Sequence, residues 1–523
     1  MARAEKPWYP TRLLHVTGLK ADTCDVRLVL TDDDRPNGPY ATLSHCWGGE
    51  RYVQLTRSTL GGFLTALDVK DMPRTFREAI AVCMVLHIEY LWIDSLCILQ
   101  DDTSDWAHEA GLMHKVYSFS HCNLSASDAG NGTHGLFRQR DTSILDLVNF
   151  HICRRDANGV LKTKLYSVQE RYLWNDSVAD SIINKRGWVF QERLLAPRIL
   201  HFTHDQLFWE CRVHSACEKY PSGFMEYALE GADFKRSLDY NKYAAKAASH
   251  PLTPEDITIC YKIWNIIVEK YTTASLTRPS DKLIAISGVA QGLVSILGDE
   301  YCVGMWRRDL EIQLLWHRGE DPTSYTRPET YRAPSWSWAS LDGSIVMNAR
   351  HFDSSDLKAH IEDVVPVHKT EDSTGQVRHG YLDLKGELKP LCLAPNLNWP
   401  HENNIHIVVQ KSRWSTEAYM RHIDTNTGFD VSGVPSSHRL NDSWERRLFY
   451  MTVVASRDYV AALMLRVGAD EDVHERIGLI ELIRGVEDND GFENGFLAGL
   501  DDSIKKTLPC LRYEDGKHTV RIV

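Results

Sequence analysis

The feature that most constrains the fold is an alternation of short apolar runs with helical patterns between residues 40 and 127. Tyr40–Ser44 is predicted to be a short apolar strand, and Tyr90–Ile93 is continuously apolar, as in a strand buried on both faces. Cys122–Ser127 is predicted to be a third strand. Between them, Thr75–His87 and Asp105–Ser118 carry apolar residues at helical spacing. A helix between two strands returns the chain to the same end of the sheet, so the strands run parallel. The sequence therefore predicts an α/β domain with a mainly parallel sheet.

Polar side chains stand where these predicted strands end. Ser44 and His45 close the first strand, Asp94 follows the second, and Ser127 ends the third. Ligands of parallel sheets bind beyond the carboxyl ends of the strands, so we expect Ser44 and Asp94 at neighbouring strand ends, with Trp47 near them. In the alternative interpretation, Asp94 is architectural and orders the loop at Ser44 and His45, because a buried carboxylate needs partners.

The segment Ile183–Cys211 (INKRGWVFQERLLAPRILHFTHDQLFWEC) contains a second candidate site. Trp188 and Glu192 are four residues apart, so they share one face of a helix. Arg186 and Arg193 flank them and suit a phosphate or a carboxylate. An acid beside an aromatic ring and arginines is what a nucleotide site requires. The alternative is a core helix whose Glu and Arg side chains form a solvated rim.

Histidine and cysteine residues gather just after Glu192. Their spacing, H-x2-H-x6-C-x2-H-x2-C, does not match a standard zinc finger, although it leaves a metal site as an alternative. The surrounding residues Phe202, Leu207, Phe208 and Trp209 instead favour two packed strands. We therefore expect no metal, and the weak candidates for ligands are His201, His204, Cys211, His214 and Cys217.

Composition and charge exclude several classes of function. The net charge of −12 is spread without long blocks, which argues against a nucleic-acid binder with a broad basic surface. Phosphate-loop, dinucleotide-binding and kinase motifs do not occur. The N-terminus lacks a signal-peptide core, and the apolar run Ile80–Ile93 is too short and too polar to cross a membrane. We expect a cytoplasmic protein whose 12 cysteines are mostly buried, reduced thiols.

After the first domain, the predicted secondary structure is first mainly helical and then mainly β-strand. Residues 223–330 have mainly helical patterns, best developed in Ile257–Tyr271 and Asp281–Leu297. Residues 331–523 form a β-rich region with many turns, which predicts a sandwich or a small barrel. Its expected strands are His360–Val367, Tyr381–Leu388, Asn404–Gln410, Tyr450–Val454, Val460–Val467, Ile477–Glu481 and Val520–Val523.

Pro334–Trp338 (PSWSW) alternates tryptophan with serine. In a strand, this spacing places Trp336 and Trp338 on one face. We interpret the pair as a core anchor, and the alternative is an aromatic cage for a ligand.

Three of these segments together resemble the signature blocks of the fungal heterokaryon-incompatibility (HET) domain. They are residues 40–49 (YATLSHCWGG), 90–102 (YLWIDSLCILQDD) and 183–211, and they place a HET domain at 20–215. His45 stands where the family often has Tyr, and Leu99 where Asn is common. The resemblance implies a role in allorecognition, innate-immune-like signalling and programmed cell death. It also implies protein partners from an incompatibility or immune system, and a homo-oligomer is a further expectation.

HET domains are often compared with TIR domains, which are flavodoxin-like, and some of which cleave NAD at its glycosidic bond. Trp188–Glu192 is similar to the TIR Trp-x-x-x-Glu segment, although Val189 replaces the usual Cys. This resemblance implies a TIR-like fold, NAD as a substrate with no resident cofactor, and Glu192 as the catalytic residue. A non-enzymatic signalling module that binds partners or self-assembles is the main alternative, and a zinc-binding protein is another. The substrate-binding residues implied are Ser44, His45, Trp47, Asp94, Arg186, Trp188 and Arg193.

Overall fold

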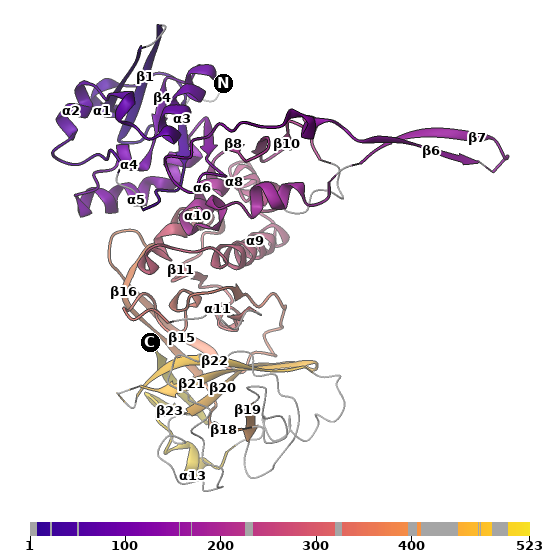
Figure 1. Ribbon diagram of the computed structural model, residues 1–523. Coiled ribbons are helices and arrows are strands. Elements are labelled where there is room, and N and C mark those ends of the chain that lie inside the picture. Colours follow the sequence, from indigo (N-terminus) through magenta and orange to yellow (C-terminus); the bar gives the residue numbers. More distant parts are fainter. Residues whose placement is uncertain are drawn as a thin grey trace. The chain divides into compact units, whose positions relative to one another are not determined.

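The computed structural model (Figure 1) divides into two compact units. Unit 1 comprises Met1–Ala248, Ala274–Leu276 and Ala285–Gly292, and unit 2 comprises Ser249–Thr273, Thr277–Ile284 and Leu293–Val523. The helical segment predicted over 223–330 is therefore divided between the two units. The residues that the structure describes are 8–20, 23–49, 52–155, 157–168, 170–224, 234–319, 327–395, 405–408, 448–468, 470, 472–483 and 500–523.

Unit 1 is built on a mixed sheet, which in the described residues has eight strands in the order β10-β9-β8-β5-β3-β4-β1-β2. The strands are β1 (Arg12–Lys20), β2 (Thr23–Leu30), β3 (Tyr40–Ser44), β4 (Tyr90–Trp92), β5 (Cys122–Ser125), β8 (Arg198–Phe202), β9 (Leu207–Cys211) and β10 (Ser215–Cys217).

The prediction of a mainly parallel sheet is correct only for the centre of this sheet. The neighbours β4, β3, β5 and β8 are parallel, whereas β1, β2, β9 and β10 pair antiparallel with their neighbours. The physical reason is the length of the connections. Only a few residues along the chain separate β1 from β2, β8 from β9 and β9 from β10. Such short connections join antiparallel neighbours, because a parallel return needs a crossover of a dozen or more residues.

The helices that connect the parallel strands form where the sequence predicts them. α3 (Arg74–Val85) begins after Pro73, and α5 (Thr103–Ser118) begins at Asp102, whose carboxylate accepts hydrogen bonds from the first turn of the helix. We number the parallel strands by their order along the chain, so that β3 is 1, β4 is 2, β5 is 3 and β8 is 4. Across the sheet they lie as β4-β3-β5-β8, which is the order 2-1-3-4. The order reverses between β3 and β5.

One face of the sheet is covered by α5 and by α6 (Gly187–Leu195). The hydroxyl of Tyr40 in β3 donates to the carbonyl of Val116 in α5 at 2.7 Å, and the rings of Trp92 and Tyr117 meet edge to face. α6 reaches the same face, because its Glu192 contacts Ser44 of β3. Short helices complete the unit: α1 (Thr31–Asp34), α2 (Leu60–Thr65), α4 (Asp94–Cys97), α7 (Phe234–Ser237) and α8 (Asn241–Ala247).

A separate hairpin, which the sequence analysis did not predict, is formed by β6 (Asn149–Arg155) and β7 (Leu161–Ser167). These strands pair only with each other in the described part of the chain. The hairpin extends away from the body of unit 1 as a long two-stranded ribbon (Figure 1).

Unit 2 joins helices to a β-rich region, as predicted. Its helices are α9 (Pro254–Thr272), α11 (Leu310–Gln313) and α13 (Asp502–Lys505), while α10 (Ile284–Leu297) is shared between the units. In place of the predicted sandwich or barrel, the described strands form one largely antiparallel sheet. Its members are β15 (His360–His368), β16 (Val377–Gly386), β17 (Leu388–Pro390), β20 (Leu448–Ala455), β21 (Tyr459–Val467), β22 (Val473–Ile483), β23 (Arg512–Glu514) and β24 (Lys517–Ile522).

Small two-stranded sheets make up the remaining strands of unit 2. Each pairs antiparallel, as β11 with β12, β13 with β14, and β18 with β19. Their bounds are Tyr301–Cys302, Met305–Trp306, His317–Arg318, Ile345–Val346, Cys392–Pro395 and Ile405–Val408.

The strand predicted at Pro334–Trp338 is wrong, although the burial of its tryptophans is confirmed. The segment is a turn followed by a 3-10 helix at Trp338–Ser340, because the Ser337 hydroxyl caps that helix and also donates to the carbonyl of Val303. Trp336 and Trp338 are both completely buried. The two tryptophans are therefore core residues, as predicted, but they lie in a turn and a 3-10 helix instead of a strand.

The run Pro279–Leu297 is long and apolar enough to cross a membrane by length and composition. Within the protein, 61% of its apolar window is buried, which is typical of a core helix. The apolar run Ile80–Ile93 is divided between α3 and β4.

Candidate functional site

The candidate site lies at the carboxyl ends of the parallel strands. The pairing register aligns Ser44 with Ser125 and Ser125 with His201 across β3, β5 and β8. On the other side, Thr42 of β3 pairs with Trp92 of β4, so the same register brings Asp94 beside Ser44. The prediction that Ser44 and Asp94 lie at neighbouring strand ends is confirmed.

α6 brings Glu192 onto this edge. The hydroxyl of Ser44 donates to Oε2 of Glu192, and the hydroxyl of Tyr117 in α5 donates to the same carboxyl group. Glu192 is buried, with 7% of its surface exposed. Two hydroxyl donors therefore fix a carboxyl group that is almost withdrawn from water.

Asn123 of β5 orients the serine. Its amide nitrogen donates to Ser44 Oγ at 2.9 Å, and its amide oxygen accepts from Thr42 Oγ1 at 3.0 Å. Sequence reasoning missed Asn123 and Tyr117. Asn123 had one usable signal, because a polar amide within a buried strand must have hydrogen-bond partners.

The environment of Glu192 changes its acidity. Burial raises its pKa to about 7, the negative charge of Asp94 acts in the same direction, and the Ser44 bond, the charge of Arg186 and the Tyr117 bond oppose the shift. At neutral pH the carboxyl group therefore exists in both protonation states, which suits a group that takes part in chemistry.

Asp94 has the architectural role considered from the sequence. Its Oδ2 accepts from the indole nitrogen of Trp47 at 2.7 Å, and its Oδ1 lies 3.8 Å from Nδ1 of His45. It therefore orders the loop after β3, as the architectural interpretation expects. Its side chain also remains 32% exposed at the rim of the site, while burial lowers the pKa of His45.

Arg186 is the N-cap residue of α6, and Trp188 belongs to its first turn. Arg186 donates to the carbonyl of His45, which ties the start of the helix to the loop after β3. The half-buried ring of Trp188 meets Trp106 of α5 edge to face, with the ring centroids 6.3 Å apart. The structure thus brings together seven predicted or newly found residues around Glu192: Ser44, His45, Trp47, Asp94, Tyr117, Asn123 and Arg186.

Arg193 faces a different partner. Its guanidinium binds both carboxylate oxygens of Glu210 in β9 at 2.8 Å, and His201 binds the same carboxylate at 3.1 Å. All three side chains are buried. Lys235 of α7 donates to the carbonyls of Arg193 and Ala196 and so closes the carboxyl end of α6. These contacts anchor the helix that carries Glu192.

We expect Glu210→Ala to lower the free energy of unfolding by about 3–5 kcal/mol, because the charge of Arg193 would stay buried without a partner. Urea unfolding of the full chain measures the loss. The matched control is Asp205→Ala, which removes an exposed pair with His204 and should cost at most about 1 kcal/mol. Equal stability of the two variants would contradict the anchoring role.

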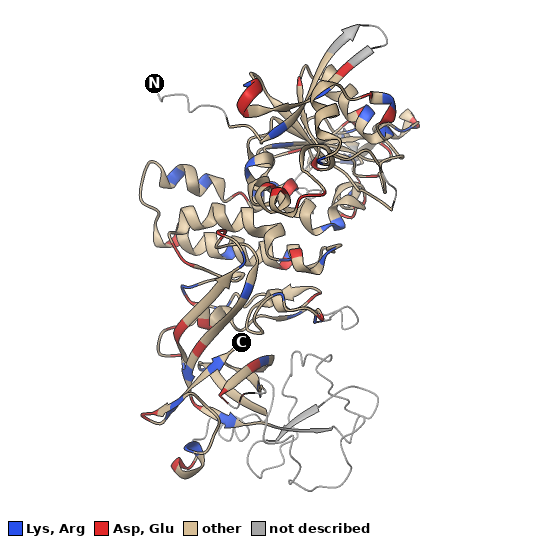
Figure 2. Cartoon of the chain, turned by 90° about the vertical axis from the view of Figure 1, so that its left-hand side faces the viewer, with Lys and Arg blue, Asp and Glu red and all other residues tan. Residues whose placement is uncertain are grey.

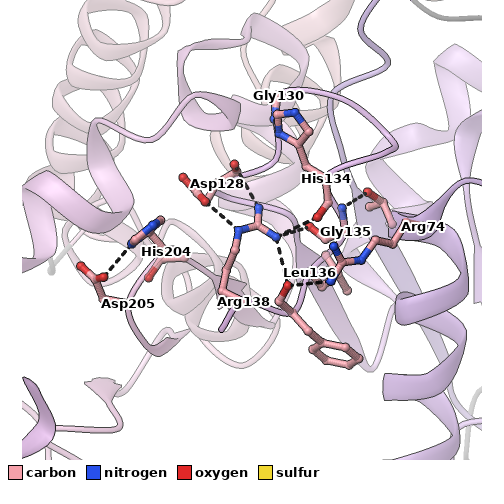
Figure 3. Close-up of polar contacts among 12 residues, drawn as sticks. Arg74, Asp128, Gly130, His134, Gly135, Leu136, Arg138, His204 and Asp205 are labelled. Atoms are coloured by element: carbon pink, nitrogen blue, oxygen red, sulfur yellow. Dashed lines mark hydrogen bonds and ion pairs between the residues drawn. The ribbon is translucent and has the colours of Figure 1, made fainter. Parts of the chain in front are cut away.

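The weak metal candidates are dispersed among other contacts. His201 belongs to the Glu210 network, the main-chain nitrogen of His214 donates to Cys211 Sγ, and Cys217 is buried in an apolar cluster with Trp174. His204 pairs with Asp205 beyond β8 (Figure 3). Among the residues that the structure describes, no group of three or more His, Cys, Asp or Glu side chains is placed to hold a metal ion.

Figure 3 also shows how the loop after β5 is closed. Arg138 points its guanidinium at Asp128, with Nε 2.9 Å from Oδ2, and at the carbonyls of His134 and Gly135. The loop that follows Ser127 therefore has a defined shape beside the strand ends.

The segment that holds this site is similar to a known family. Residues 40–192 match the family model described as Heterokaryon incompatibility protein (HET). The match begins with β3 and ends at Glu192, so it contains Ser44, Asp94, Tyr117 and Asn123 as well. The HET resemblance predicted from the sequence is confirmed for these residues. No curated protein and no solved structure matches the chain.

Proposed function

We propose that the HET-matching segment acts in heterokaryon incompatibility by hydrolysing NAD at the bond between nicotinamide and ribose. The observation that carries the proposal is the buried carboxyl group of Glu192, which Ser44 and Tyr117 hold at the strand ends and whose pKa is raised to about 7. Protein partners in the cytoplasm would supply the signal that starts this activity.

The position of the site supports a nucleotide ligand. The order 2-1-3-4 of the parallel strands is that of flavodoxin-like sheets, in which ligands bind where the strand order reverses. Ser44 ends β3 at this reversal, and Ser125 ends β5 on its other side. The TIR-like fold remains part of the proposal and rests on this order.

The chemistry needs a negative charge in a site protected from water. The bond between C1′ of the ribose and the nicotinamide nitrogen breaks, and its electron pair stays on nicotinamide. The ionised Glu192 stabilises the positive charge that develops on the ribose. Water then attacks C1′ and releases a proton, which the partly exposed Asp94 passes to solvent. The products are nicotinamide, ADP-ribose and one proton.

The remaining residues have binding roles in this proposal. Trp47 and Trp188 are half-buried and offer ring faces for stacking, and Arg186 holds the diphosphate. The role predicted for Arg193 changes, because its guanidinium already binds Glu210. It supports α6 instead.

The test is to incubate the purified full chain with NAD and to measure nicotinamide and ADP-ribose. The rate should rise as the pH increases through about 7, because only the ionised form of Glu192 stabilises the ribose cation. A rate that is level between about pH 6 and pH 8 would contradict control by Glu192. Absence of product at every pH would favour the non-enzymatic signalling module.

A further inference from the structure

The hairpin β6–β7 is unusually exposed for a segment rich in large apolar residues. Every residue of β6 and β7 for which the structure describes burial is exposed. The large apolar side chains of the hairpin and its base are between 40% and 61% exposed: Leu147, Val148, Phe150, Ile152, Val160, Leu161, Leu165, Tyr166 and Val168. A two-stranded ribbon is at best marginally stable alone in water, and exposed apolar surface of this kind marks an interaction site.

One face of the ribbon combines aromatic, aliphatic and basic side chains. The register pairs Phe150 with Tyr166, Ile152 with Lys164, and Arg154 with Lys162, so these six residues share a face. The rings of Phe150 and Tyr166 stack with centroids 5.9 Å apart, and Lys164 lies over Tyr166. The apolar residues of this face lie toward the base of the ribbon and the cations toward its tip.

The charge of the ribbon indicates what it binds. Residues 149–167 contain four Arg or Lys and one Asp, a net charge of +3, whereas the whole chain carries −12. The rest of the chain therefore carries −15, and its Asp and Glu residues lie on many helices and strands, interspersed with Lys and Arg (Figure 2). Two ribbons would repel each other, which disfavours pairing of ribbon with ribbon and favours a receiving surface of net negative charge.

We propose that the β6–β7 ribbon is a dimerisation arm that docks on the acidic body of a second copy of this chain. In such a dimer each copy places its ribbon on the body of the other copy. The same contact is then formed twice, as two-fold symmetry requires. The apolar base of each ribbon is then covered by the other copy, and its cations meet acidic residues. This inference is independent of the proposed cleavage of NAD.

Sedimentation velocity of the full chain tests the proposal. The parent should be a dimer at about 0.05 M ionic strength and dissociate toward monomer at about 0.5 M, because salt screens exposed charges. The double variant Arg154→Glu, Lys164→Glu should weaken dimerisation at least about tenfold. Phe150→Ser with Tyr166→Ser should weaken it as well, since it removes the apolar part of the same face.

The matched control reverses two exposed cations outside the arm, Lys242→Glu and Lys246→Glu of α8. It changes the net charge equally and should leave the dimer at least as stable as in the parent. A parent chain that is monomeric at all concentrations, or a dimer that the arm variants do not weaken, would overturn the proposal. Arm-dependent binding of the monomer to phosphatidylserine vesicles would overturn it too, since the arm would then serve an anionic lipid surface.

Discussion

Glu192→Gln should abolish the release of nicotinamide from NAD and at the same time stabilise the folded protein at pH 8. The amide has nearly the size of the acid, and the hydroxyls of Ser44 and Tyr117 can accept as well as donate, so the site keeps its shape. The charge that stabilises the ribose cation is lost, so the rate should fall at least about 100-fold.

The gain in stability follows from the same burial. An unfolded glutamate loses its proton near pH 4.5, whereas the pKa of Glu192 in the folded chain is about 7. The folded state therefore loses stability as the pH rises from about 4.5 to about 7, by roughly 3 kcal/mol in all. The amide does not titrate, so the advantage of the variant should be largest at pH 8 and small near pH 5. Urea unfolding at both pH values measures it.

The matched control is Glu89→Gln, an identical change at an exposed position. It should alter neither the rate nor the pH dependence of stability. Cleavage of NAD that survives in Glu192→Gln would remove Glu192 from the chemistry. A parent that never releases nicotinamide, but that causes cell death on expression only while Glu192 is present, would instead indicate a signalling module.

Trp338→Ala should destabilise unit 2 by about 3–5 kcal/mol, enough to unfold a domain of ordinary stability. The side chain is completely buried, and its indole nitrogen donates to the carbonyl of Gly304 at 2.7 Å. The fit is close, because a Cβ on Gly304 would lie 2.6 Å from that nitrogen, and Gly304 has a φ of +96° that favours glycine. The expected result is loss of soluble protein, measured by yield and by urea unfolding.

Phenylalanine substitutions separate packing from hydrogen bonding at the two tryptophans. Trp338→Phe loses the bond to Gly304, whereas the indole nitrogen of Trp336 has no hydrogen-bond partner among the described residues. Trp338→Phe should therefore cost about 1 kcal/mol more than Trp336→Phe. Alanine variants of both residues that remain as stable as the parent and lose a binding partner would show that the segment is a recognition site.

Local patterns in the sequence were sufficient for the elements of the site. A short apolar run followed by a polar residue predicts a buried strand that ends at that residue, and the structure places Ser44 and Asp94 at such strand ends. The spacing of Trp188 and Glu192 predicts one face of a helix, and α6 bears it out. These features depend on neighbouring residues along the chain, so they can be read before the fold is known.

Contacts between residues far apart in the sequence could not be predicted from such local patterns. The partners of Glu192 come from β3 and α5, and the residue that orients Ser44 comes from β5. The sequence around Arg193 suggested a phosphate-binding arginine, but its guanidinium binds Glu210. Glu210 reaches this position because β9 pairs antiparallel with β8.

The sequence by itself determined the α/β class of unit 1, the strand ends that carry polar residues, and the HET resemblance, which the family model confirms over residues 40–192. The tertiary structure decided which acid is buried, which arginine has a partner, and that the β6–β7 ribbon stands exposed. The physical reason is that burial and pairing set the pKa of a carboxyl group and the energy of an apolar side chain, and both depend on elements that meet only when the chain folds.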